Sequence, residues 1–378
     1  MLPASSKITV MGKKTDYRFK LLYCIGIIMV VLGHCQGGSI HILDNWFPLG
    51  GMHLMLFVFA SGYFYSLDAV EHIGGYLLKK LKKLAVPLFF YNVFYGLFAS
   101  FMQKRGFYFG SRLTLKSLLI DPITSGHQFA YNMGSWFVVP LLMCEVYNVC
   151  LRYLLKKVRI SETLYFIFNL ILGIAGIELA ILGYNYGWYL PLVRFLYFLP
   201  FYSFGTYYHQ FLEERDLKIP DHLYFSAIFI IKLAIAFFLL KMPNYTPSWC
   251  NDFTDGPVIP IINGLLGVMF WFRVCHILEP VMGKGRYVNM IADHTYSIMM
   301  NQFLGFFLIK FIFSLISIYT PVFKDFDQTL YHTDIFYYFL PHGQEFMLLI
   351  YVATAIIIPV IIDLLIETVK DKIKSACH

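Results

Sequence analysis

Two histidines lie deep within apolar stretches of the sequence. His34 ends the apolar run that begins at Ile25, and His53 opens the run that continues to Phe64. An ionisable side chain is costly inside a membrane, so each histidine is a functional candidate. Two imidazoles that meet at one depth would form a reaction centre able to exchange protons near neutral pH. The structural alternative is a pair of buried rings that hydrogen-bond to backbone or hydroxyl groups.

Three further polar side chains, Glu145, Arg194 and Asn301, also lie within apolar stretches. Ionisable residues within membrane spans usually face the interior of the helix bundle and pair with one another. Arg194 can therefore be structural, paired with Glu145 or Glu178, or it can contact a substrate directly. The sequence leaves both interpretations open.

A cluster of four lysines, Lys79, Lys80, Lys82 and Lys83, comes shortly before Pro87. Such a cluster at the end of a membrane span is typical of topology signals and of contacts with lipid headgroups. The alternative is an electrostatic site for the phosphates of an anionic donor, since lysine binds phosphate as a point charge. Either interpretation places the cluster at the cytoplasmic mouth of the third predicted span.

The composition indicates which elements position these residues. Of the 378 residues, 58% are apolar and 14% are charged, whereas soluble domains carry about 25% charged residues. The sequence therefore predicts an all-α polytopic membrane protein. A membrane-spanning helix needs roughly 20 apolar residues, which predicts a bundle of about ten transmembrane helices at residues 18–36, 47–66, 85–102, 135–151, 161–183, 188–210, 221–241, 257–276, 291–317 and 344–366.

The basic residues set the orientation, because Lys and Arg concentrate in cytoplasmic loops. With both termini in the cytoplasm, 21 of the 30 basic residues fall inside, which explains the net charge of +7 better than nucleic-acid binding does. His34 then lies 14 residues after Lys20, about 21 Å from the inner boundary, and His53 lies seven residues after Trp46, about 10 Å below the outer one. In a hydrocarbon core about 30 Å thick these depths coincide, and the short linker makes the two helices neighbours.

The chain divides into three parts: residues 1–17, a cytoplasmic N-terminal segment; residues 18–366, one transmembrane domain; and residues 367–378, a cytoplasmic tail. Seven cysteines are scattered along it without a CxxC or a metal-ligand spacing, so neither a disulfide framework nor a metal site is expected. Membrane lipids are the expected surroundings of the central part, and the sequence does not predict an oligomeric state.

Several segments resemble motifs of the membrane acyltransferases called acyltransferase family 3, and most closely the sugar O-acetylases of the fucose 4-O-acetylase type. Residues 25–34, IGIIMVVLGH, resemble the end of that family's first helix, and residues 53–64, HLMLFVFASGYF, resemble its HMPLFFFISGYF motif. The lysine cluster, residues 135–137 and residues 199–205 follow in the family's order. The resemblance thus spans most of the chain.

Four positions depart from the family's pattern. Tyr23 stands where the family usually has a basic residue, and Lys20 stands where it often has an acidic one. Met55 replaces the usual proline, and Gln302 ends a segment that often ends in histidine. The customary basic partner in the first helix is therefore missing at its usual position.

The resemblance implies transfer of an acyl group, commonly acetyl from cytoplasmic acetyl-CoA, to a sugar hydroxyl of a polysaccharide or lipid-linked glycan. It implies that His34 is the general base or a covalent acyl carrier, and that His53 orients it or handles the second proton. The lysine cluster would bind the phosphates of CoA. Donors for the tetrahedral oxyanion and a further substrate contact would come from polar residues within the spans: Arg194, Ser61, Asn301 and Glu145.

No metal and no permanently bound cofactor is implied, and the expected location is the cell membrane, most simply the bacterial cytoplasmic membrane. A second class of function remains open at this point. An exporter of polysaccharide or lipid-linked sugar could use the histidines as proton carriers, although the sequence shows none of the internal symmetry that many transporters have. Binding of acetyl-CoA would separate the two classes, because an exporter has no need of it.

Overall fold

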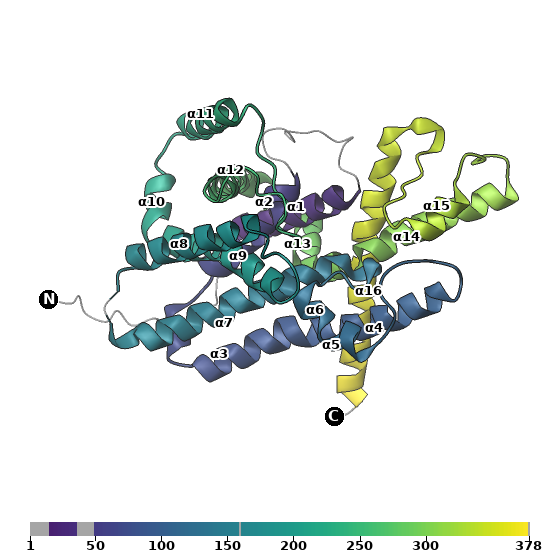
Figure 1. Ribbon diagram of the computed structural model, residues 1–378, viewed down its shortest axis with the longest axis horizontal. Coiled ribbons are helices and arrows are strands. Elements are labelled where there is room, and N and C mark those ends of the chain that lie inside the picture. The colour runs from purple at the N-terminus through teal and green to yellow at the C-terminus, as the bar shows by residue number, and fades with distance from the viewer. Residues whose placement is uncertain (1–14, 36–48, 159, 377–378) are drawn as a thin grey trace.

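The computed structural model describes residues 15–35, 49–158 and 160–376, and every regular element in these residues is a helix (Figure 1). Apolar runs fold as helices in a membrane because a helix satisfies its own backbone hydrogen bonds. The α-helices are α1 (Tyr17–His34), α2 (Leu49–Tyr63), α3 (Ile73–Lys80), α4 (Val86–Gln103), α5 (Leu115–Leu119), α6 (Asp121–Thr124), α7 (Val138–Leu154), α8 (Glu162–Ile181), α9 (Tyr189–Tyr207), α10 (Glu213–Asp216), α11 (Asp221–Leu239), α12 (Ile259–Met282), α13 (Arg286–Asp293), α14 (Thr295–Tyr319), α15 (Gln328–Thr333) and α16 (Leu348–Ala376).

Short helical turns of other types join or extend these helices. Two are π-helical turns, η2 (Leu81–Ala85) between α3 and α4, and η5 (Tyr208–Leu212) between α9 and α10. The others are 3-10 turns: η1 (Leu67–Val70), η3 (Ala130–Phe137), η4 (Leu155–Lys157), η6 (Pro341–Gly343) and η7 (Glu345–Met347). The predicted segment 1–17 lies almost entirely outside the described residues, as does Trp46.

Each of the ten predicted spans overlaps a helix. Eight helical stretches among the described residues are long and apolar enough to cross a membrane, which makes the chain a multi-pass helical membrane protein. The other two predicted spans fall on α2, whose apolar part Met52–Tyr63 is short, and on α9, which carries Arg194 and several tyrosines. The total of ten spans and the cytoplasmic placement of both termini remain predictions. The predicted tail 367–378 begins inside α16, which continues to Ala376.

Helices α2 and α9 pack backbone against backbone. A Cβ atom at Gly62 would lie 1.8 Å from the carbonyl oxygen of Tyr202, and one at Gly205 would lie 2.2 Å from that of Phe59. The hydroxyl of Thr206 donates to the carbonyl oxygen of Gly62 at 2.8 Å. Small residues allow such close approach between membrane helices. The glycine of the SGYF segment therefore fixes the helix that carries the second histidine.

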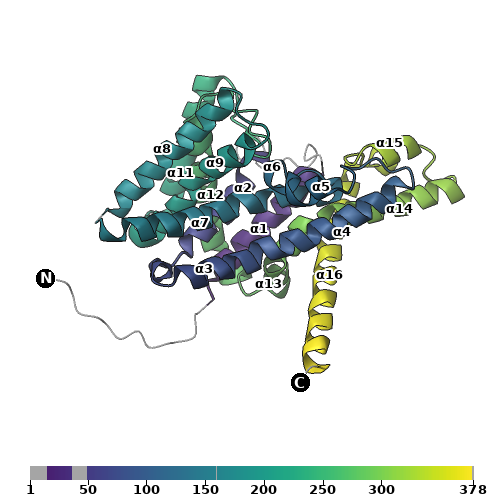
Figure 2. The same cartoon turned by 60° about the horizontal axis from the view of Figure 1, so that its bottom comes forward.

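A second close contact joins α14 to α16. A Cβ atom at Gly305 would lie 2.6 Å from the Cα atom of Ala355, and the hydroxyl of Ser297 donates to the carbonyl oxygen of Pro359 at 2.9 Å. Figure 2 shows α16 leaving the other helices and carrying the C-terminus away from them. The first half of α14, which contains Gln302, thus packs against the long helix α16.

The start of α1 is tied to neighbouring helices through charged groups. Arg18 forms ion pairs with Asp16, at 2.6 Å, and with Glu213 of α10, at 2.8 Å. The hydroxyl of Tyr63 also donates to Glu213 at 2.8 Å. Burial raises the pKa of the Glu213 carboxyl, but hydrogen bonds from Tyr63, His209 and Arg18 outweigh it and hold that pKa below its usual value. This network fixes the register of α1 against the end of α2.

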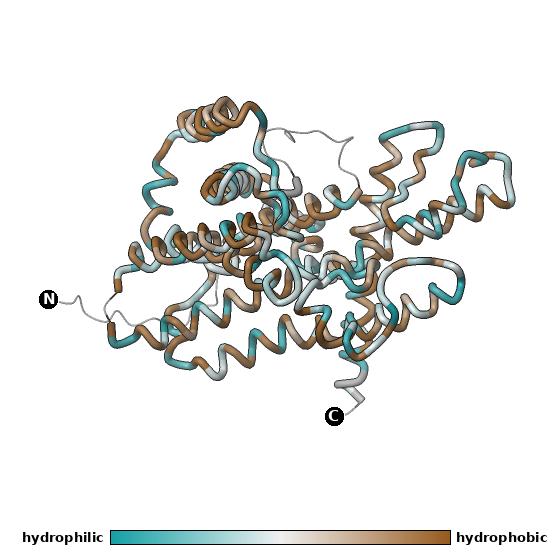
Figure 3. The backbone as a smooth tube through the Cα atoms, viewed as in Figure 1, coloured by the Kyte–Doolittle hydropathy of each residue, from teal (hydrophilic) through white to brown (hydrophobic). Residues whose placement is uncertain are grey.

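The outer surface of the bundle is strongly apolar. Figure 3 shows apolar residues dominating the long helices, whereas hydrophilic residues gather in the short helices and turns. On α11 the side chains of Phe237 and Phe238 are 80% and 87% exposed. Such exposure suits contact with lipid chains. In water, an apolar surface of this kind would cause the protein to associate with other molecules.

Candidate active site

The two sequence-predicted histidines lie at one cavity, which we call the histidine cavity. Its volume is about 590 Å³, and both His34 at the end of α1 and His53 on α2 line it. The two residues are close neighbours, since a Cβ atom at Gly33 would lie 4.0 Å from Cε1 of His53. The expectation that two adjacent helices bring the imidazoles together is confirmed. Their chemical roles remain predictions.

The ring of His34 is oriented by Gln302 of α14. Nδ1 of His34 lies 3.0 Å from Oε1 of Gln302, whose Nε2 donates to the carbonyl oxygen of Met299 at 3.2 Å. Since the amide nitrogen has a carbonyl acceptor, Oε1 faces the histidine, and the assigned hydrogen bond runs from Nδ1–H to Oε1. The neutral ring then has its lone pair on Nε2. This tautomer is the one that can act as a base through Nε2.

The backbone and the face of His34 are held as well. The hydroxyl of Tyr338 donates to the carbonyl oxygen of His34 at 2.7 Å, which satisfies a group that the end of α1 leaves free. The ring of Phe303 lies beside the imidazole, with ring centroids 5.1 Å apart. His34 is thus fixed from three sides, by residues 302, 303 and 338.

His53 is more buried, with 7% of its surface exposed. Its Nδ1 has no hydrogen-bond partner among the described residues. A buried polar atom without a partner costs roughly 1–3 kcal/mol, so such an atom at a cavity points to a group that arrives with a ligand. A substrate hydroxyl or carbonyl group would fill this role.

A third histidine, His127, also lines the histidine cavity. It lies between α6 and η3, and its Nδ1 is 2.9 Å from the carbonyl oxygen of Ser125, which fixes Nδ1 as the protonated nitrogen. Its ring stacks on Trp249, with centroids 4.4 Å apart. Burial first, and the Arg194 cation second, lower the pKa of His127 to about 3, so the ring is neutral. Sequence reasoning missed this residue because it lies outside every predicted span.

The structure does not pair Arg194 with Glu145 or Glu178, so this one of the two alternatives is excluded. Arg194 donates instead to two backbone carbonyls, those of Ser248 and, at 2.9 Å, Ser125. It does not line the histidine cavity. The reason is that position along a helix predicts depth but not the direction in which the side chain points. Arg194 joins two loops that cover the cavity and so positions His127 and Trp249.

A second cavity, which we call the Lys20 cavity, lies next to the first. Its volume is about 360 Å³, and its polar residues include Lys20 of α1, Ser61 of α2, Lys83 and Asp293. Lys20 forms an ion pair with Asp293. Tyr23, which stands at the position where the related family usually has a basic residue, lines this cavity too. Ser61 therefore faces the Lys20 cavity and not the histidine cavity.

The two cavities share four wall residues, and all four are apolar: Val30, Leu54, Phe137 and Met299. We call this shared wall the neck. The Lys20 cavity, with its charged residues at the start of α1, and the histidine cavity therefore adjoin each other at the neck.

The four lysines of the cluster do not form a single site. Lys80 forms an ion pair with Glu145, which also accepts hydrogen bonds from Tyr76 and Tyr202. Lys83 lines the Lys20 cavity. The cluster lies within one continuous helical stretch, Ile73–Gln103, in which successive side chains point in different directions. The four lysines therefore do not converge on one site, and the Glu145 carboxylate is engaged by protein side chains.

The remaining lysines and Asn301 face elsewhere. Lys82 lines a third cavity together with Lys83. Lys79 is exposed and lines none of the cavities described here. Asn301 also belongs to the third cavity, where its side chain accepts a hydrogen bond from the hydroxyl of Tyr95 at 2.6 Å. The expected oxyanion donors Arg194, Ser61 and Asn301 are thus all absent from the lining of the histidine cavity.

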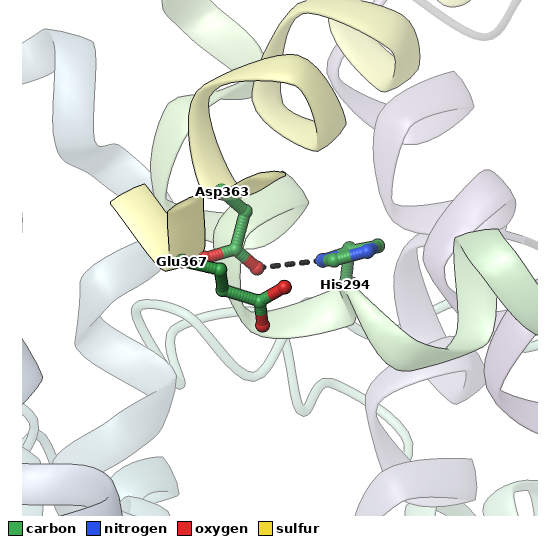
Figure 4. Close-up of side chains that lie close together, drawn as sticks. All are labelled: His294, Asp363 and Glu367. Atoms are coloured by element: carbon green, nitrogen blue, oxygen red, sulfur yellow. Dashed lines mark hydrogen bonds and ion pairs between the residues drawn. The ribbon is translucent and has the colours of Figure 1, made fainter. Parts of the chain in front are cut away.

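A cluster of possible metal ligands lies near the start of α14. Figure 4 shows Asp363 and Glu367 of α16 close to His294, and one potential ligand atom from each lies within 4.8 Å of the others. His294 Nδ1 donates to Asp363 at 2.7 Å. This hydrogen bond ties the junction of α13 and α14 to α16. The expectation that no metal takes part remains a prediction.

Comparison with known proteins agrees with the geometry. A family model described as an acyltransferase domain, that of acyltransferase family 3, matches residues 16–366. No curated protein and no solved structure gave a match. The matched segment covers both cavities, the neck and all eight long apolar stretches except the last few residues of α16. The chain belongs to acyltransferase family 3 and is a membrane acyltransferase.

Proposed function

We propose that the protein transfers an acyl group, acetyl from acetyl-CoA, to a sugar hydroxyl of a polysaccharide or lipid-linked glycan. It acts in the bacterial cytoplasmic membrane. The observation that carries this proposal is the pair of adjoining cavities, one with cationic residues at its mouth and one with His34 and His53. This arrangement suits a donor and an acceptor that meet at the histidines from different directions.

The donor enters through the Lys20 cavity. Lys20 and Lys83 are the cations at its mouth, and they attract the phosphates of CoA. The thioester end of the donor passes the apolar neck and reaches His34. Lys83, not the whole cluster of four lysines, thus takes the role that the family resemblance implied, together with Lys20.

The acceptor enters the histidine cavity from the side covered by the loops that Arg194 joins. Trp249 is 46% exposed there and stacks on His127. An aromatic ring offers a flat apolar surface to the face of a sugar, and a few polar groups then fix its orientation. His53, with its unpartnered Nδ1, provides such a polar group.

The reaction needs one proton to move twice. Nε2 of His34 takes the proton from the sugar hydroxyl as the oxygen attacks the thioester carbonyl, and a C–O bond forms. The tetrahedral intermediate collapses with cleavage of the C–S bond, and the imidazolium of His34 returns the proton to the CoA thiolate. The products are the O-acyl sugar and CoA. His53 hydrogen-bonds the acceptor or the developing oxyanion.

The test combines a binding measurement with an analysis of glycans. Purified protein in detergent should bind acetyl-CoA, and a Lys20→Ala protein should bind it more weakly. A matched control is Lys156→Ala, since Lys156 lies in η4, away from the Lys20 cavity. Mass spectrometry of surface glycans should show loss of an acetyl mass from cells that lack the protein. Unchanged glycans and absence of acetyl-CoA binding would together favour export of a sugar instead.

A further inference from the structure

The third cavity, which we call the aromatic groove, is the largest of the three. Its volume is about 750 Å³, and it lies between α4, α14 and α16. Its walls are mainly apolar. Two of the wall residues, Phe90 and Phe94, are 65% and 50% exposed. In a membrane such a groove faces lipid chains, so its walls need no cover from the protein itself.

One end of the groove is cationic. Lys82, Lys83 and Lys370 line it, and none of the three has an ion-pair partner in the described part of the chain. The one carboxylate in the lining is Asp363, which His294 already engages at 2.7 Å. Even when Glu367, which lies close to Asp363, is counted, three cations face two carboxylates, so the groove favours an anionic group at this end.

The dimensions of the groove match one leaflet of a membrane. From Lys83 to Phe94 the helix advances by 11 residues, which at 1.5 Å each is roughly 17 Å. Half of a hydrocarbon core about 30 Å thick is close to this length. A ligand with a phosphate at the lysines and an acyl chain along Phe90 and Phe94 therefore fits both the charge and the length.

We propose that the aromatic groove binds an anionic phospholipid, with its phosphate at Lys82 and Lys370 and one acyl chain along α4. The exposed aromatic side of the groove at Phe90 and Phe94 argues against CoA as the occupant, because the amide groups of its pantetheine arm would face lipid chains there without partners. Lys83 and Tyr296 line both the groove and the Lys20 cavity. The lipid thus lies next to the donor and is suited to tune its binding.

The experiment uses photoreactive lipids with the purified full-length protein in a neutral detergent. A phosphatidylglycerol and a phosphatidylcholine carry the same diazirine-labelled chain, and labelled peptides are identified by mass spectrometry. Phosphatidylglycerol should label peptides of α4 and α16 several-fold more than phosphatidylcholine does. A lysine near a headgroup phosphate contributes about fivefold in affinity, so Lys82→Ala with Lys370→Ala should lower that labelling by roughly 25-fold.

Lys79→Ala is the matched control, since Lys79 belongs to the same cluster but does not line the groove. It should label as the unmodified protein does. Equal labelling by the two lipids, or labelling that the Lys82→Ala and Lys370→Ala changes leave unaltered, would overturn the proposal. Displacement of the lipid by excess CoA would also overturn it, because the groove would then be part of the donor site. Lys20→Ala separates this result from the proposed function, since Lys20 does not line the groove.

Discussion

The histidine cavity and the aromatic groove differ in how their polar side chains are held. Around the histidine cavity, His34 is bound to Gln302, and both His127 and Arg194 are bound to backbone carbonyls. In the groove, the lysines have no ion-pair partners among the described residues, and the aromatic walls are exposed. Fixed groups suit a reaction, which needs polar groups placed before the substrate arrives, whereas adaptable groups suit a lipid of variable chain.

Replacement of His34 removes the feature that most distinguishes the histidine cavity. Loss of a general base lowers the rate by roughly 10²–10⁴-fold, so His34→Ala should lose acyl transfer by that factor in reconstituted vesicles. Acetyl-CoA binding and thermal stability should persist, since the proposed site for the donor phosphates is the Lys20 cavity. His222→Ala, on exposed α11, is the matched control. Wild-type activity in His34→Ala would refute the catalytic role.

Gln302 tests whether orientation of the ring matters as much as its presence. Gln302→Leu removes the acceptor for Nδ1–H, so the ring can adopt the other tautomer, and the rate should fall by roughly 10–100-fold, as for other partners that orient a histidine. Gln302→His keeps an acceptor and should retain more activity. The readout is kcat, with KM for acetyl-CoA little changed. Equal rates for the two variants would show that the hydrogen bond does not orient His34.

Packing provides a third contrast. Gly62→Ala places a Cβ atom against the backbone of Tyr202 and should destabilise the protein by about 1–3 kcal/mol, seen as a lower midpoint of thermal unfolding in detergent. At Gly74, on α3, an added Cβ atom meets no atom within 4 Å. Gly74→Ala should leave stability unchanged or raise it by about 0.5–1 kcal/mol. Similar effects at the two glycines would mean that α2 and α9 are not closely packed.

The smallest expected effect concerns pH. The pKa of His127 is lowered to about 3 in the folded protein, whereas an unfolded histidine titrates near pH 6.5. As the pH falls from 6.5 towards 3, the unfolded state gains a proton that the folded state does not, so stability is lost. His127→Asn lacks this dependence. When the pH is lowered from 7 to 5, the midpoint of thermal unfolding should fall less for the His127→Asn protein than for the unmodified protein, by about 1–2 °C.

Much of the fold was accessible from sequence, since long apolar runs leave few alternatives in a membrane. The meeting of His34 and His53 was accessible too, because depth along two consecutive spans follows from residue counts and interfacial residues. The direction in which side chains point was not accessible from sequence. The contacts of Arg194 with backbone carbonyls and of Glu145 with Lys80 were therefore not predicted. Gln302 and His127 were missed as neighbours of His34 and His53, because one comes from a distant span and the other from a loop that folds back over the cavity.

The neck between the two cavities has a consequence for the cell's energy supply. A continuous wet passage through the protein would let protons and ions leak and would discharge the membrane potential. Four apolar side chains, Val30, Leu54, Phe137 and Met299, line the point where the cavities meet. Narrow apolar constrictions exclude water and thereby block ions. Under the proposed function, the acyl group passes this apolar wall, whereas ions do not, and the membrane remains electrically sealed.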